Sequence, residues 1–263
     1  ENAWTAAGIS AAWTMFPDHP HAEAWKQGVM NWALNAVTRT LDRHRYPSGL
    51  IDQAEGPAAK TVTFHPDFTT ENHAFVHPAY MAAGINLRAI AVILAQLAGE
   101  QPLPVLTHNN LEMYEATLKK WVQFDGLIVP VQGQDWWYNR HHDNAVTHAV
   151  INVTEKDSDA ARLERNAIET IEKLQASNRR GCLLEENPEE YVFNRAHGQF
   201  ANQLEHGSAC DIAYSFLLHT FGGAGADPAR QEDVIGRLQG VYTYPFGSVV
   251  VHRTAGTLSA FSW

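Results

Sequence analysis

Asn72 and His73 stand side by side, and a tyrosine in an aromatic segment, Tyr138, follows further along the chain. Side-chain amides and imidazoles can donate hydrogen bonds to a carboxylate, and such donors stabilise negative charge that develops beside it. A tyrosine hydroxyl can give or take a proton. These residue types suit β-elimination in a uronic-acid polymer, in which a weakly acidic C5 proton leaves next to a neutralised carboxylate. We therefore predict that the three residues are catalytic if their two segments meet in space.

The residues that flank these positions are charged or aromatic, and we predict that they bind substrate: Glu71, Trp136, Trp137, Arg140 and His141. Indole rings offer flat apolar faces on which sugar rings can stack. The cationic residues make the local field positive, which lowers a tyrosine pKa and attracts an anionic sugar. A competing interpretation treats Asn72 as a cap for a helix that starts near Pro78, and the tryptophans as core or lid residues.

A second polar segment, from Asn194 to Ser208, contains His197 and His206. Apolar spacing predicts a helix that begins at Ser208, with Ser208 and Asp211 as a capping pair. Because the start of a helix favours an anion, we predict that both histidines line the far side of a substrate cleft. A solvated loop with ordinary capping by Ser208 explains the same residues.

The composition of the 263-residue chain indicates a folded protein, since 45% of its residues are hydrophobic. This length suits one large domain, or one domain with a small appendage. The formal charge of −10 and the pI near 5.7 disfavour a nucleic-acid partner, and any anion site must be local. We expect no membrane partner, because no continuous apolar run of membrane-spanning length is evident.

The histidines and cysteines of the chain form no strong metal-binding motif. Cys182 and Cys210 belong to no CxxC pair, and the 14 histidines include no HExxH pattern, although His73 and His77 have helical spacing. We therefore expect no required cofactor and no catalytic metal ion.

Apolar residues recur at helical spacing and predict helices over residues 22–41, 78–98, 110–124, 144–153 and 158–175, and another that begins at Ser208. Asp157 or Ser158 is the predicted N-cap of the fifth helix. Loops as long as 42–77 and 177–205 are unusual for a simple helical bundle, because structureless loops beyond about 15 residues are more often functional. No strand–helix alternation is visible. We therefore predict an all-α fold over residues 1–239, an (α/α) toroid or incomplete barrel whose loops build a cleft.

Residues 240–263 are rich in β-branched and aromatic residues around an Ala255-Gly256 turn, which predicts an antiparallel β-hairpin. An isolated hairpin is only marginally stable in water. We therefore expect this hairpin to begin a β-sandwich domain, the rest of which belongs to a longer parent chain and is missing here.

The Asn72-His73 pair and the segment from Gly133 to Tyr138 resemble motifs of the heparinase II/III-like polysaccharide lyases and the related exo-type alginate lyases. The resemblance covers roughly residues 64–148 and the C-terminal hairpin. It implies an (α/α) toroid followed by β-sandwich layers. It also implies that Asn72 and His73 neutralise the uronate carboxylate and that Tyr138 shuttles the proton.

The same resemblance implies a substrate, a location and one further residue. The substrate is an anionic polysaccharide or oligosaccharide of the glycosaminoglycan or alginate type, and the protein is secreted or periplasmic. Members of the group also use a histidine from the β-domain, for which His252 is the candidate, and some carry a structural divalent metal ion there. This chain departs from the group in two ways, because Tyr138 is further from His73 than usual and Gln134-Asp135 replaces the commoner Asp-Gly order.

Two other functions fit the sequence. A glycoside hydrolase on the same toroid would need two facing carboxylic acids, which these four residues could supply: Asp67, Glu71, Asp135 and Asp143. A non-catalytic carbohydrate-binding module would use Trp136 and Trp137 to stack sugars. The product separates the two enzymes, because only a lyase creates a C4–C5 double bond that absorbs ultraviolet light.

Overall fold

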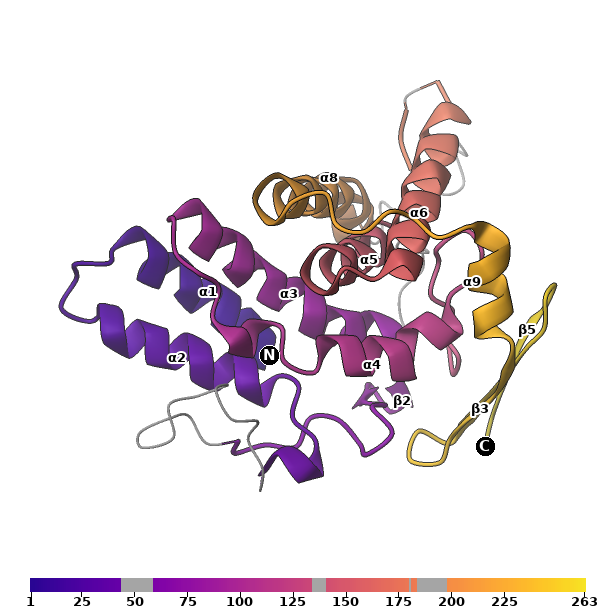
Figure 1. The fold of residues 1–263 in the computed structure, drawn as a ribbon, viewed down its shortest axis with the longest axis horizontal. Coiled ribbons are helices and arrows are strands. Elements are labelled where there is room, and N and C mark those ends of the chain that lie inside the picture. The colour runs from indigo at the N-terminus through magenta and orange to yellow at the C-terminus, as the bar shows by residue number, and fades with distance from the viewer. Residues whose placement is uncertain (44–58, 134–140, 180, 184–197) are drawn as a thin grey trace.

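The computed structural model describes residues 1–43, 59–133, 141–179, 181–183 and 198–263 (Figure 1). This part of the chain is mostly helical and ends in a small antiparallel sheet, as the sequence predicts. Its eight α-helices are α1 (Asn2–Met15), α2 (Ala22–Asn35), α3 (Pro78–Leu97), α4 (Asn110–Ala116), α5 (His141–Glu155), α6 (Ser158–Ala176), α8 (Gly198–Gly222) and α9 (Gln231–Leu238). Short 3-10 helices lie between some of them: η1 (Thr40–Arg43), η2 (Pro104–Leu106) and η3 (Leu118–Trp121).

Helices α1, α2 and α3 pack together at one end of the molecule (Figure 1). Their shared core consists of small and branched residues: Ala6, Val29, Ala33, Leu34, Ala91 and Val92. Apolar periodicity does not predict α1, because the buried stripe of this helix is alanine, serine and threonine. The two buried hydroxyls in that stripe are satisfied within the helix, since Ser10 donates to the Ala7 carbonyl and Thr14 to the Ser10 carbonyl.

Two predicted helices are shorter than expected. Helix α2 ends at Asn35 rather than at residue 41. The Asn35 side chain binds the backbone of a later segment, at residues 60 and 61. Its Oδ1 accepts from the backbone amides of Lys60 and Thr61 at 2.7 and 2.9 Å. The helix predicted over residues 110–124 is interrupted at Thr117, whose φ of −128° and ψ of −79° are not helical, so that η3 follows α4.

Helix α3 carries Pro78 in its first turn, as predicted. Contrary to expectation, it is long and apolar enough by composition to cross a membrane, although 56% of that segment is buried inside the protein. Arg88, in its middle, is fully buried, and its Nη1 donates to the carbonyls of Val105 and His108. A buried cation that is hydrogen-bonded within the protein is what we expect of a core helix rather than a lipid-facing one.

Helix α5 packs against both α6 and α8 (Figure 1). Helix α6 begins as predicted, with Asp157 as its N-cap, because Asp157 Oδ1 accepts from the Ala160 amide at 2.6 Å. The predicted start of α8 is wrong: the helix begins at Gly198, and Ser208 is buried inside it rather than capping it. Phe216, a large apolar residue of this helix, is 68% exposed. The first ten residues of α8 are mostly polar or glycine, so they give no apolar period.

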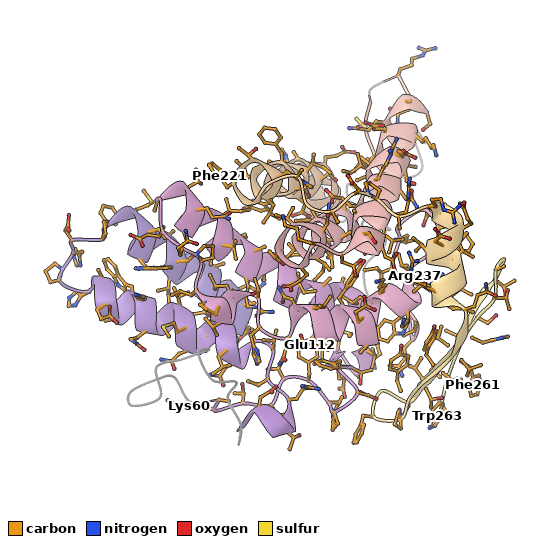
Figure 2. The ribbon with its side chains drawn as sticks, viewed as in Figure 1. Lys60, Glu112, Phe221, Arg237, Phe261 and Trp263 are labelled. Carbon is orange, nitrogen blue, oxygen red and sulfur yellow. The ribbon has the colours of Figure 1, made fainter. Side chains whose placement is uncertain are left out.

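Strands β3 (Gly240–Tyr244), β4 (Val249–Arg253) and β5 (Leu258–Ser262) form an antiparallel sheet in that order. The predicted hairpin corresponds to β4 and β5, and β3 adds a third strand. One face of the sheet packs on α4 and η3, since the Tyr244 hydroxyl donates to the Ala116 carbonyl at 2.8 Å and the Tyr244 ring meets Trp121 edge-on. On the other face, Phe261 and Trp263 are each 64% exposed and extend away from the helices (Figure 2).

Candidate functional site

Asn72 and His73 lie on a small hairpin of two strands, β1 (Glu71–Asn72) and β2 (Phe75–Val76), which the sequence analysis missed. The turn consists of His73 and Ala74, whose φ angles are both positive, at 53° and 71°. Two positive φ angles in a two-residue turn are typical of a type I′ turn, where Asn-Gly is preferred. Other residues hold this strained backbone only where the surroundings fix it, and such strain is concentrated at functional sites.

The hairpin exposes His73 beside a tyrosine of α3. The ring centroids of His73 and Tyr80 are 5.4 Å apart in an edge-to-face contact. Tyr80 also contacts the ring of His77 at 4.8 Å, and His77 is only 2% exposed. Asn72 is half-buried, whereas Glu71 is exposed. Tyr80 therefore contacts His73 of the predicted pair, and its place in the first turn of α3, just after the loop, is the sequence signal for this contact.

Gln132 joins this hairpin to the C-terminal sheet. Its Oε1 accepts from the Val76 amide at 2.6 Å, and its Nε2 donates to the Gly247 carbonyl at 2.6 Å. Gly247 lies in the turn between β3 and β4. Because Gln132 directly precedes the Gly133 motif, the chain enters that motif next to β2. Residues 134–140 themselves lie outside the described residues.

Asp67 fixes the loop ahead of the hairpin. Its Oδ1 accepts from the Thr69 amide at 3.1 Å and from the Thr69 hydroxyl at 2.7 Å, and its Oδ2 accepts from the Phe246 amide at 3.0 Å. A Cβ atom on Gly247 would lie 2.8 Å from Thr69 Cγ2, so the β3–β4 turn packs tightly on this loop. Both oxygens of Asp67 are thus engaged in holding the chain, which disfavours Asp67 as a catalytic acid of a hydrolase.

The remaining predicted site residues are dispersed along the chain. Five of them lie outside the described residues: Trp136, Trp137, Tyr138, Arg140 and His197. His141 is the first residue of α5, and its side chain is also outside the described part. His206 is exposed within α8, so the prediction that it sits on a loop ahead of a helix is wrong. His252 is exposed on β4, on the face opposite the buried Arg253.

Two polar side chains pair deep in the core, where α4 meets α5. His148 Nε2 lies 2.8 Å from the Gly126 carbonyl, and His148 Nδ1 lies 2.7 Å from the Tyr114 hydroxyl. A carbonyl can only accept, so Nε2 carries the proton and Nδ1 accepts from Tyr114. Burial lowers the pKa of His148 to about 4, and the imidazole is therefore neutral at ordinary pH. This histidine has a structural role.

Substitution of Tyr114 by Phe is expected to lower the free energy of unfolding by about 1–3 kcal/mol, because the buried His148 Nδ1 loses its donor. Denaturant titration of both proteins at neutral pH measures this difference. The matched control is Tyr242→Phe, since the half-buried Tyr242 hydroxyl donates to the Leu238 carbonyl near solvent. An equal loss in the two variants would contradict the structural role given to the pair.

A second histidine, His219 of α8, pairs with a carboxylate of α6. His219 Nε2 lies 2.8 Å from Glu164 Oε1, and Glu164 Oε2 accepts from the Asn152 side chain at 2.8 Å. The hydrogen bond to Glu164 raises the pKa of His219 above its ordinary 6.5. Protonated His219 therefore holds α8 to α6 more tightly than neutral His219 does.

This pairing predicts how stability depends on pH. A raised folded-state pKa means that the contribution is complete below pH 6.5 and is lost as the pH rises through the folded value. We expect a decrease of about 1 kcal/mol in the free energy of unfolding over that interval. Denaturant titrations across the pH range, made for the parent protein and for Glu164→Gln, measure it. Parallel curves for the two proteins would contradict the assignment.

Within the part of the chain that the structure describes, no three histidine, cysteine or acidic side chains gather in a group that could hold a metal ion. No family model, curated protein or solved structure matches this chain. No relative therefore supplies a residue role here. Residue roles in this chain are therefore inferred from its sequence motifs and from the geometry of the β1–β2 hairpin.

Proposed function

We propose that this chain is a polysaccharide lyase that cleaves a uronic-acid polymer by β-elimination. The observation that carries the proposal is the strained turn at His73 and Ala74, which exposes the imidazole directly beside Asn72. The Gln132 bridge adds support, because it brings the start of the second motif to the same hairpin. The strained turn has a clear use if the Asn-His pair receives a substrate carboxylate.

In the proposed reaction, the side chains of Asn72 and His73 donate hydrogen bonds to the uronate carboxylate. This stabilises the negative charge that develops when the C5 proton leaves, an effect worth about 3–4 kcal/mol for one donor in comparable oxyanion sites. The C5–H electron pair forms the C4–C5 double bond, and the C4–O glycosidic bond breaks. Tyr138, as the phenolate, takes the C5 proton and then gives a proton to the departing oxygen, which regenerates the phenolate. Each cycle yields one unsaturated end and one new hydroxyl end.

Trp136 and Trp137 stack sugar rings, Arg140 and His141 attract the anion, and the polymer is of the glycosaminoglycan or alginate type. The pairing of α1 with α2 and of α5 with α6 supports successive helical hairpins, as in an (α/α) toroid. The exposed outer face of the three-stranded sheet is compatible with further β-layers in a longer protein. A secreted or periplasmic location follows from such a substrate.

The products test the proposal. The protein is incubated with alginate, hyaluronan and a heparan-type polymer, and both ultraviolet absorbance and new reducing ends are measured. A lyase raises both signals together on one of the polymers. New reducing ends without absorbance would instead indicate a hydrolase, and polymer binding with neither signal would indicate a binding module. Either of those results contradicts the lyase assignment.

A further inference from the structure

A pocket of 410 Å³ lies between the turn that follows η3 and the turn that joins β4 to β5. Its lining combines polar, charged and apolar residues: Gln123, Phe124, Asp125, Arg253, Thr257 and Leu258. Gly256, at the β4–β5 turn, leaves the pocket open, since a Cβ atom there would meet no atom within 4 Å. The volume lies in the size range of small-molecule sites. None of these residues belongs to the β1–β2 hairpin, so this is a separate site.

Arg253 is the most unusual residue of the lining, because it is only 3% exposed. Its Nη1 donates to the backbone carbonyls of Lys120 and Val122. Its Nε is buried and has no hydrogen-bond partner in the described part of the chain. Two carbonyl oxygens therefore fix the guanidinium in place but leave its hydrogen-bonding capacity partly unused.

The charge of Arg253 is also left without a counterion. Among the described residues no carboxylate lies within ion-pair distance of it, although Asp125 lines the same pocket. Asp125 Oδ1 is engaged locally and accepts from the Leu127 amide at 3.0 Å. A buried cation without a partner is costly, and burial accordingly lowers the pKa of Arg253. An anion that enters the pocket would remove this cost.

We propose that this pocket binds a small carboxylate that carries a sugar ring, a monosaccharide uronate. The positive charge of Arg253 lies in the pocket wall, and a carboxylate in the pocket would be its missing counterion. Phe124, which is 36% exposed, offers an aromatic face beside it for the apolar side of a ring. Gln123 and Thr257 supply polar groups for ring hydroxyls. A bare inorganic anion would use the arginine and leave these other groups without a role.

The test compares glucuronate with glucose and with sulfate by isothermal titration calorimetry. Glucose has the same ring without the carboxylate, and sulfate has the charge without the ring. We expect glucuronate to bind more tightly than either. Asp125→Asn keeps the Oδ1 acceptor for the Leu127 amide and removes a negative charge that repels the ligand carboxylate. It is therefore expected to tighten glucuronate binding about two- to fivefold. The matched control is Glu169→Gln, which removes the same charge from the exposed surface of α6 and should change nothing.

Two further variants address the named groups. Arg253→Lys retains a positive charge but loses the planar group that the Lys120 and Val122 carbonyls hold in place, and it is expected to weaken glucuronate binding about tenfold. Phe124→Ala is expected to weaken glucuronate binding but not sulfate binding, and it does not alter the buried arginine. Equal binding of glucose and glucuronate, or unchanged affinity in Asp125→Asn together with Phe124→Ala, would overturn the proposal. Because the assay uses a monosaccharide and no turnover, its failure leaves the lyase proposal untouched, and a missing lyase product leaves this site untouched.

Discussion

Replacement of Tyr138 by Phe is expected to lower turnover of a uronate polymer by about 10²–10⁴-fold, the usual contribution of a positioned acid or base. The phenyl ring keeps the shape of the side chain, so polymer binding should remain within about twofold. The reason is that the departing glycosidic oxygen no longer receives a proton. Initial rates measured by ultraviolet absorbance, together with polymer affinity measured separately, distinguish a chemical loss from a binding loss.

Tyr80→Phe is the matched control for this experiment. Tyr80 lies 5.4 Å from His73 between ring centroids and belongs to the rigid start of α3. If Tyr138 is the shuttle, Tyr80→Phe keeps most of the turnover. The reverse pattern, with full activity in Tyr138→Phe and its loss in Tyr80→Phe, would transfer the role of the shuttle to Tyr80. That result would leave the Asn72-His73 pair in place and replace only its partner.

Replacement of Arg88 by Met is expected to lower the free energy of unfolding by about 3–5 kcal/mol, because several buried acceptors lose their donors and each such loss costs about 1–3 kcal/mol. Arg88 Nε donates to the Gly84 carbonyl at 2.8 Å, Nη1 donates to two further carbonyls, and Nη2 donates to the Asn110 side chain. Burial lowers the pKa of Arg88 to about 9, so it still carries its charge at neutral pH. Methionine fills much of the same space but leaves the carbonyls of Val105 and His108 without these donors.

Denaturant titration measures the effect of Arg88→Met, with Arg165→Met as control. Arg165 lies on the surface of α6, is 61% exposed and pairs only with Glu169 among the described residues. Its substitution should change stability by less than about 1 kcal/mol. Similar losses in the two variants would mean that the buried guanidinium is not a structural centre of this fold.

The sequence predicted those helices that combine a branched apolar stripe with a recognisable start. The expected range 78–98 differs from α3 by one residue at its end, and Asp157 caps α6 as expected. Helix α1 escaped detection because small residues form its buried face, and the start of α8 escaped because polar residues and glycine form its first turns. Periodicity detects elements that bury large apolar side chains and misses those that bury small ones.

Of the candidate site, only the features formed by neighbouring residues could be predicted from the sequence. The sequence alone shows that Asn72 and His73 are adjacent. It does not predict the hairpin that carries them, because the strands have only two residues each and the turn lacks the usual Asn-Gly sequence. The partners of Gln132 and Arg253 are backbone carbonyls and amides far away in sequence. Backbone groups are the same at every residue, so no residue pattern reveals such contacts. The role of Tyr138 stays a prediction.

The Gln132 bridge couples the local unfolding of two parts of the protein, the β1–β2 hairpin and the C-terminal sheet. The Gly247 carbonyl and the Phe246 amide both belong to the β3–β4 turn, and they hold Gln132 and Asp67 respectively. The hairpin and the terminal sheet therefore form one cooperative unit, and neither can unfold locally without exposing hydrogen bonds of the other. The C-terminal sheet thus helps to hold the Asn72-His73 pair in position. Substitutions that unfold this sheet should therefore also disturb the geometry of the pair.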